Sequence, residues 1–182
     1  LPSLFLIVGD TTDKAEIGRI LEASKLRRLE YGALIFLDRK RRVLASSEPA
    51  VFREGSGYSP RLEPLPGDVT FSKPFALPPF SSPLMEATYT NGERSVVALI
   101  DLGYLSSKLI LITDSPSDRL DILDSDGRYL ASSDSSMAGR GASRQASFLG
   151  KKVEIDEEGG NRYFVSSQPI LGSSWKAVYY RS

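Results

Sequence analysis

The 182-residue sequence contains neither cysteine nor histidine. Without cysteine the chain has no disulfide bonds and no thiolate nucleophile, and without histidine it has no imidazole base. The Cys/His zinc sites and the Ser-His-Asp hydrolase mechanisms are therefore excluded. A chain without cysteine is compatible with an oxidising compartment.

The sequence also lacks an excess of charge of either sign and a long apolar run. It has 23 Lys and Arg residues against 23 Asp and Glu residues, whereas a nucleic-acid-binding domain shows a basic surplus. It contains no apolar run of eighteen or more residues and no signal peptide. Because it starts at Leu1, we expect a segment excised from a longer protein. Apolar residues make up 41% of the chain, which is enough for a buried core.

One sixteen-residue pattern occurs twice. Residues 33–48 are ALIFLDRKRRVLASSE, residues 119–134 are RLDILDSDGRYLASSD, and eight of the sixteen positions are identical without a gap. The two copies start 86 residues apart (119 − 33), which is the size of a small domain rather than of a solenoid repeat. The sequence therefore predicts two copies of one compact unit.

Periodicity and turn signals predict an antiparallel sheet in each copy. Asp13 is a suitable N-cap for a helix over residues 13–25, and Asn91-Gly92 is a strong hairpin signal between two apolar runs. A second helix is expected over residues 102–111, and the joint between the domains over residues 113–117. Strands are expected at 34–37, 43–46, 69–71, 84–90 and 94–100 in the first half. In the second half they are expected on both sides of the turn at 124–127 and at 153–155, 163–170 and 175–180. The predicted class is therefore α+β, with a five-stranded antiparallel sheet and flanking helices in each half.

Residues 49–83 differ from the rest of the chain. They contain eight of the eleven prolines and little periodicity. Loops of this length are either functional or disordered, and the five aromatic residues of this segment favour an ordered loop. We therefore expect it to cover one face of the first sheet.

The order and duplication of these motifs resemble the double Cache sensor domain, an extracytoplasmic ligand-binding region built from two PAS-like sheets. The motifs in the first copy are Leu37-Asp38, Leu44-Ala45-Ser46-Ser47, Ser72-Lys73-Pro74-Phe75 and the strand end Val97 to Asp101. Those in the second copy are Leu123-Asp124-Ser125-Asp126-Gly127-Arg128, Ala131-Ser132-Ser133, Ser166-Ser167-Gln168-Pro169-Ile170 and Trp175.

The resemblance implies two tandem PAS-like units joined by an N-terminal helix. Residues 1–113 would form the membrane-distal, ligand-binding unit, and residues 114–182 the membrane-proximal unit. The protein would be a bacterial inner-membrane receptor with flanking transmembrane helices. Its output would be a histidine kinase, a cyclic-dinucleotide enzyme or a chemoreceptor. Family members often pair through the first helix; because that helix is cut here, a homodimer and a monomer are both compatible with the resemblance.

The resemblance also implies a ligand site. In the amino-acid-binding members an Arg followed by Trp-Tyr holds the ligand carboxylate, and an Asp at the end of a late strand holds the ammonium. Arg61 and Asp101 stand at these places, but Leu62-Glu63-Pro64 replaces the aromatic pair. The predicted ligand-binding residues are Arg61, Asp101, Tyr58, Tyr89 and Phe71, and the expected ligand is a small molecule with a carboxylate or an amine.

Several of these residues also have a structural interpretation. Asp101 is a suitable N-cap for the helix that follows, a loop arginine such as Arg61 is often solvated, and Tyr58 and Tyr89 could fill the core. We expect the repeated Ala-Ser-Ser and the aspartates Asp38 and Asp124 to hold the strands and turns through side-chain to backbone hydrogen bonds.

No catalytic residue, metal or cofactor is predicted. Residues 124–127 resemble the start of a calcium loop, but the closing Glu is absent. Ser173 and Lys176 have the spacing of an acyl-serine enzyme, but a strand places them on opposite faces. The favoured function is a non-enzymatic sensor; the alternatives are a carboxylate-based hydrolase or lyase, and an adaptor without a small ligand.

Overall fold

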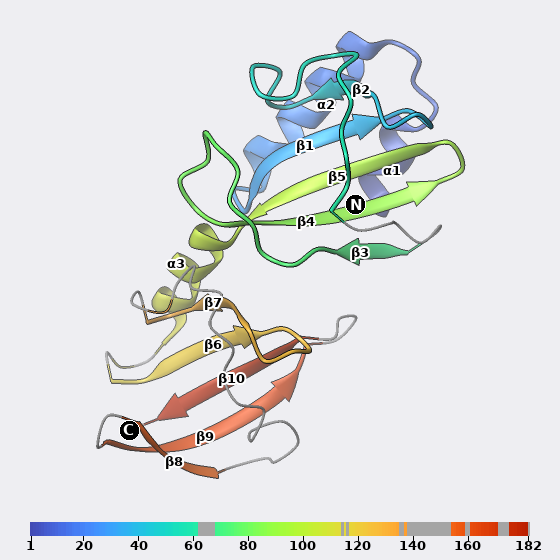
Figure 1. The fold of residues 1–182 in the computed structure, drawn as a ribbon. Coiled ribbons are helices and arrows are strands. Elements are labelled where there is room, and N and C mark those ends of the chain that lie inside the picture. The colour runs from blue at the N-terminus through green and yellow to red at the C-terminus, as the bar shows by residue number, and fades with distance from the viewer. Residues whose placement is uncertain are drawn as a thin grey trace. The chain divides into compact units, whose positions relative to one another are not determined.

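The computed structural model describes residues 1–61, 68–113, 115, 117–134, 137, 154–158, 161–170 and 175–181. The chain forms two compact units, Leu1–Asp101 and Leu102–Ser182. Each unit has one five-stranded antiparallel sheet (Figure 1). The α+β class predicted from the sequence is confirmed.

The first unit combines two helices with a sheet of strand order β2-β1-β5-β4-β3. Its elements are α1 (Pro2–Val8), α2 (Lys14–Arg27), β1 (Tyr31–Leu37), β2 (Val43–Ser46), β3 (Val69–Phe71), β4 (Leu84–Asn91) and β5 (Arg94–Asp101). The hairpin of β4 and β5 turns at Gly92, whose φ of 61° lies in the left-handed region that favours glycine. This is the turn that Asn91-Gly92 predicted.

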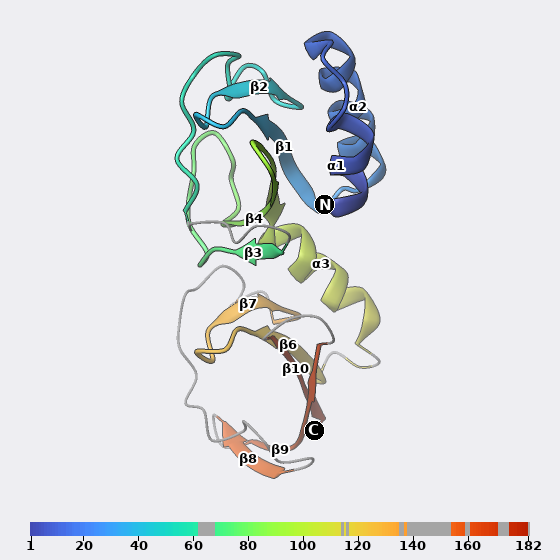
Figure 2. The same ribbon diagram turned by 90° about the vertical axis from the view of Figure 1, so that its right-hand side faces the viewer.

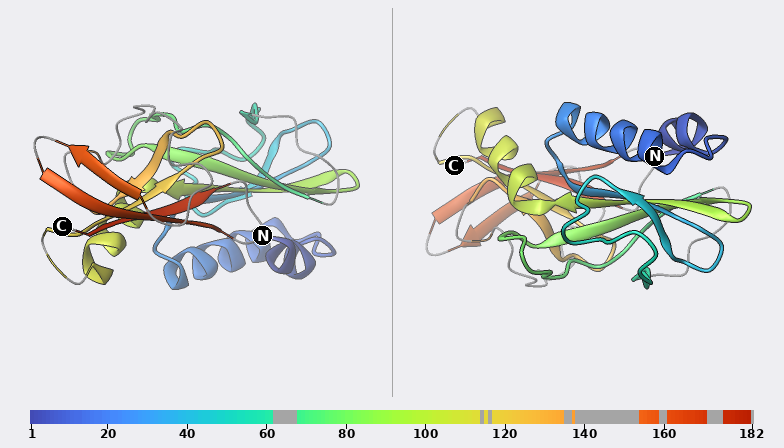
Figure 3. Two further views of the ribbon diagram at one scale, coloured as in Figure 1. Left: turned by 90° about the horizontal axis from the view of Figure 1, so that it is seen from below. Right: turned by 90° about the horizontal axis from the view of Figure 1, so that it is seen from above.

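Both helices of this unit lie on the same side of the sheet (Figure 2, Figure 3). Helix α2 begins at Asp13, whose side chain accepts hydrogen bonds from the backbone N–H of Ala15 at 2.9 Å and of Glu16 at 3.4 Å. It buries Ile17 and Leu21, whereas α1 buries Phe5 and Val8. The helix predicted over residues 13–25 is confirmed as α2, and α1 and α2 both belong to the first unit.

The first sheet thus has two differently covered faces. On the helix face, the helices pack over a buried cluster that includes Leu34, Phe36, Ala87, Val96 and Ala98. On the loop face, residues of the segment 49–83 pack over a second cluster; the sheet contributes Ala33, Ile35, Leu37, Leu84, Val97 and Leu99, and the loop contributes Phe52, Tyr58, Phe75, Leu77 and Phe80. The described part of the segment is thus the ordered cover that its aromatic residues predicted.

The second unit has the same sheet topology. Its elements are α3 (Leu102–Ile112), β6 (Arg119–Leu123), β7 (Tyr129–Ser132), β8 (Glu154–Glu158), β9 (Asn161–Pro169) and β10 (Lys176–Arg181), and the strand order is β7-β6-β10-β9-β8. Helix α3 packs on β6 and β7, as α2 packs on β1 and β2.

The boundary between the units differs from the prediction of 1–113 and 114–182. It falls after Asp101, before α3, and not in the polar segment 113–117. The reason is that α3 buries Leu102, Ser106 and Leu109 and forms its contacts with the second sheet. The turn residues after α3 mark the end of a helix and not the end of a domain.

The repeated Ser-Ser pair makes the same hydrogen bond in both units. The backbone N–H of Leu34 donates to Ser47 Oγ at 2.9 Å, and that of Leu120 donates to Ser133 Oγ at 2.8 Å. These bonds join the two strands of each repeated hairpin. The structural interpretation of the motif is confirmed.

The repeated aspartates also act alike. Asp38 Oδ1 accepts from the backbone N–H of Arg42 at 2.8 Å, and Asp124 Oδ1 accepts from that of Arg128 at 2.9 Å. The hydrogen bond from the backbone of Arg42 is the largest cause that lowers the pKa of Asp38. Both aspartates hold their turns, as expected.

Some expectations fall on residues outside those described. They are the site segment Leu62-Glu63-Pro64 and Ser173. Within the described residues, no helix is both long and apolar enough to cross a membrane.

Candidate ligand site on the loop face of the first sheet

The alternation of β4 places an acidic side chain on the loop face. Leu84 belongs to the loop-face cluster and Ala87 to the helix-face cluster. Because successive side chains of a strand point to opposite faces, Glu86 and Thr88 lie on the same face as Leu84. Glu86 is only 1% exposed, so the sheet holds a carboxylate beneath the covering loop.

Three donors surround the Glu86 carboxylate. Oε2 accepts a hydrogen bond of 2.6 Å from the Tyr58 hydroxyl, and Oε1 accepts one of 3.0 Å from the Thr88 hydroxyl. The backbone N–H of Arg61 donates to both oxygens, at 3.1 and 3.3 Å. Hydrogen bonds to an ionised acceptor are the stronger kind, and these fix the segment from Tyr58 to Arg61 against β4.

Tyr58 is a neutral donor in this arrangement. Burial and the neighbouring Glu86 carboxylate raise the pKa of its phenol far above the usual value. The ring packs edge-on against Phe52, with the ring centroids 5.9 Å apart. Tyr58 is therefore held from both ends, by an aromatic contact and by its hydroxyl.

Arg61 carries a guanidinium group without a carboxylate partner in the described part of the chain. Its side chain is exposed, and its Cζ lies 4.2 Å from the centroid of the Phe75 ring. Stacking on an aromatic ring orients a guanidinium group while it leaves the edge with the N–H donors open. A ligand carboxylate is the natural partner of such an edge.

Asp101 lies on the same face by strand register. It is the last residue of β5 and pairs with Leu84, while Glu86 pairs with Leu99 on the same two strands. Directly paired residues share a face, so Asp101 and Glu86 are diagonal neighbours. The backbone N–H of Asp101 donates to the Glu30 carbonyl at 2.8 Å.

Two of the predicted ligand-binding residues do not join this group. Phe71 and Tyr89 pack in the helix-face cluster, and the Tyr89 ring contacts Phe5 of α1 with centroids 5.4 Å apart. The sheet separates them from Arg61, so they do not line a site with it. The structure therefore brings Tyr58, Arg61 and Asp101 to one face and assigns Phe71 and Tyr89 to the core on the other side.

Glu86 is not among the site residues that the sequence predicted, although a signal was present. It stands in the middle of an otherwise apolar or weakly polar strand, LMEATYT. A charged residue at such a position is expected to have hydrogen-bond partners or a function. The sequence did not reveal which face the loop would cover.

Comparison with known proteins was made by sequence and by structure. No family model and no curated protein matches the sequence. The extracellular domain of the putative histidine kinase rpHK1S-Z16 matches with a TM-score of 0.77 and 13% identity, over 100% of this chain and 83% of that chain. The ligand-binding domain of the Pseudomonas fluorescens chemoreceptor CtaA, solved with L-alanine, matches with a TM-score of 0.72 and 14% identity. The match covers 98% of this chain and 84% of that chain.

A further match is the ligand-binding domain of Mlp24 with asparagine, with a TM-score of 0.62 and 17% identity over 98% of this chain and 80% of that chain. At these identities the likeness is one of fold. The chain has the fold of the Cache-type ligand-binding sensor domains of histidine kinases and chemoreceptors, which confirms the fold expected from the resemblance.

Proposed function

We propose that this chain is the small-molecule sensing region of a bacterial signal-transduction receptor and that it lies outside the cytoplasmic membrane. The common strand order of the two sheets and the repeated hairpin support a tandem pair of PAS-like units. The structural neighbours are sensor and receptor domains and not enzymes, which supports a non-catalytic role. Flanking transmembrane helices and a homodimer through the N-terminal helices belong to the same proposal.

The first unit is the ligand-binding unit in this proposal. The observation that carries it is the buried Glu86 carboxylate beneath a loop whose Arg61 guanidinium has no acidic partner among the described residues. A ligand carboxylate would pair with Arg61, and a ligand amine would face the acidic pair Glu86 and Asp101. Small amino acids and related zwitterions fit both requirements.

The hydrogen bonds at Glu86 suggest how binding is coupled to the loop. Glu86 holds Tyr58 and the backbone of Arg61, so one carboxylate of the sheet fixes the part of the loop that carries Arg61. A ligand that prefers one arrangement of this loop shifts the population toward it. Such couplings typically amount to about 1–3 kcal/mol.

A melting screen tests the proposal. We expect at least one compound from a panel of amino acids, amines and small carboxylates to raise the melting temperature, and Arg61→Ala to abolish the rise. Arg53→Ala is the matched control, because Arg53 is an exposed arginine of the same loop and its side chain forms no hydrogen bond or ion pair with the described residues. Glu86→Gln keeps the shape of the side chain, removes its charge, and should weaken binding of amines more than binding of simple carboxylates.

Other outcomes would contradict the proposal. If the ligand binds Arg61→Ala as well as the wild type, the site is elsewhere. If the panel stabilises nothing and a partner protein binds instead, the adaptor alternative is favoured. Turnover of an ester or glycoside panel would favour the carboxylate-based enzyme.

A further inference from the structure

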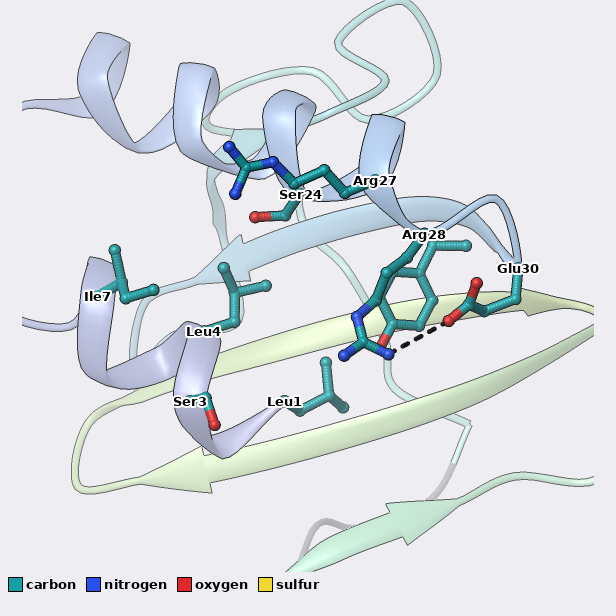
Figure 4. A pocket seen from close by; sticks show the side chains of 9 residues that line it. Leu1, Ser3, Leu4, Ile7, Ser24, Arg27, Arg28 and Glu30 are labelled. Carbon is teal, nitrogen blue, oxygen red and sulfur yellow. Dashed lines mark hydrogen bonds and ion pairs between the residues drawn. The ribbon is translucent and has the colours of Figure 1, made fainter.

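A cavity of ligand size lies on the helix side of the first unit, away from the loop face. It is a groove of about 670 Å³ between α1, the last turn of α2 and the start of β1 (Figure 4). Small-molecule sites commonly have about 300–1,000 Å³. The groove is lined by Leu1, Ser3, Leu4, Ile7, Ser24, Arg27, Arg28, Glu30 and Tyr31.

One wall of this groove is apolar. Leu1, Leu4 and Ile7 come from α1. The Ile7 side chain is 59% exposed although it is a large aliphatic group. Phe5 and Val8 of the same helix are buried, and Leu1 and Leu4 pack against the helix-face core. Ile7 is therefore the part of this wall that the core leaves exposed.

The opposite wall is basic. Arg27 and Arg28 lie at the end of α2, and Figure 4 shows both side chains at the groove. Arg28 pairs with Glu30 at 3.5 Å, which is a weak, exposed ion pair. Arg27 has no ion pair among the residues that the structure describes. Two cations against one carboxylate give the groove a net positive charge.

Hydroxyl groups complete the lining. Ser24 and Tyr31 are half-buried at the groove, and burial raises the pKa of the Tyr31 phenol. Tyr31 is therefore neutral at physiological pH and available as a hydrogen-bond donor to an anion.

We propose that this groove binds a small anionic amphiphile, an organic carboxylate with an apolar body of several carbons. The carboxylate would pair with the Arg27 or the Arg28 guanidinium group, whose planar donor sets suit it. The apolar body would lie on Leu1, Leu4 and Ile7 and remove their surface from water. This site is independent of the proposed loop-face site, because the sheet separates the helix layer from the loop.

Octanoate is a direct probe of the proposed site, with octylamine and octan-1-ol as controls for charge and for apolar surface alone. We expect calorimetry to detect octanoate binding and to show much weaker binding of the two controls. Arg27→Gln/Arg28→Gln should raise the Kd about tenfold or more, as expected from the loss of charged hydrogen bonds. Ile7→Ser should also weaken binding.

Arg19→Gln is the matched control. Arg19 is an exposed arginine on α2 and lies outside the groove, and its side chain forms no hydrogen bond or ion pair with the described residues. We expect it to leave the Kd unchanged. Cations in the last turn of a helix also stabilise the helix itself, so the decisive measurement is affinity and not stability.

Three results would overturn the inference. If octanoate binds the wild type and Arg27→Gln/Arg28→Gln equally well, the two arginines do not contact the ligand. Loss of octanoate binding in Arg61→Ala would move the ligand to the loop face. If sedimentation shows a dimer that Ile7→Ser dissociates and octanoate does not affect, a second copy of the chain occupies the groove.

Discussion

Tyr58 shows how one residue connects burial, charge and the proposed site. Its ring is part of the loop-face core, and its hydroxyl donates to the buried Glu86 carboxylate. Burial and the carboxylate both disfavour the phenolate, which is why the pKa is raised in the folded protein. In the unfolded chain the phenol returns to its ordinary value of 10.0.

This difference predicts a loss of stability at high pH. Above about pH 10 the unfolded chain releases the Tyr58 proton while the folded chain retains it, so the unfolded state binds fewer protons and stability falls as pH rises. The contribution is fully present below pH 10 and decreases by up to about 1.4 kcal/mol per pH unit above it. Urea unfolding at several pH values should show a smaller decrease for Tyr58→Phe; an identical slope would contradict the assignment.

At the scale of elements, the repeated hairpins show how one turn tolerates different residues. The turn position two residues before the second hairpin strand is Arg41 in the first copy and Gly127 in the second, with φ of 58° and 76°. Both values lie in the left-handed region, where a side chain costs about 1–2 kcal/mol. The turn geometry is thus kept by its hydrogen bonds at Asp38 and Asp124 and not by glycine alone.

Two glycine substitutions should therefore have opposite effects. Gly127→Ala should destabilise the protein by about 1–2 kcal/mol because of its positive φ. Gly18→Ala, inside α2, should stabilise it by about 0.5–1 kcal/mol, because a Cβ there meets no atom within 4 Å. Thermal unfolding of both variants tests the pair, and shifts of equal sign would contradict the prediction.

Two positions that are apolar in the first sheet carry charged residues in the second. Where β1 has Ala33 and Ile35, β6 has Arg119 and Asp121. Asp121 is fully buried, and its Oδ2 lies 3.2 Å from Arg119 Nε. Ser132 donates to Asp121 Oδ1 at 2.6 Å. The first unit shows that this fold accepts apolar side chains at both positions.

Removing one partner of the Arg119–Asp121 pair should lower the free energy of unfolding more than replacing both partners. Asp121→Ala leaves a guanidinium group with 14% exposure and should destabilise the second unit by about 3–5 kcal/mol. The double variant Arg119→Ala/Asp121→Ile, which copies the first unit, should recover most of the loss. The fluorescence of Trp175, the single tryptophan of the chain, reports unfolding of this unit; a double variant as unstable as the single one would contradict the argument.

At the scale of the whole molecule, the proposed function needs the ligand to act beyond the unit that binds it. The second unit begins with α3 directly after Asp101, the last residue of β5. A ligand at Arg61 and Asp101 would therefore act at the covalent connection between the units. Coupling between the units therefore has to be measured on the intact chain, with both units present.

Hydrogen exchange provides that measurement. A ligand found in the melting screen should change the protection of amides in α3 and β10 as well as in the first unit, by a free energy of about 1–3 kcal/mol. Arg61→Ala should remove both changes. Protection that changes in the first unit alone would contradict transmission through the chain.

Much of the architecture follows from local sequence. Asp13, Asn91-Gly92 and the repeated Ala-Ser-Ser each specify a cap, a turn or a strand pair through contacts with close neighbours. Such signals are readable because the partners are near in sequence. For the same reason the duplicated hairpin predicted two similar sheets.

The tertiary structure alone decided the membership of the site and the boundary of the units. Alternation shows that Tyr89 and Glu86 lie on opposite faces of β4, but only the packed chain shows that the helices cover one face and the loop the other. Only long-range packing assigns α3 to the second sheet. Burial depends on what lies across the space from a residue, and that information is distributed over distant parts of the chain.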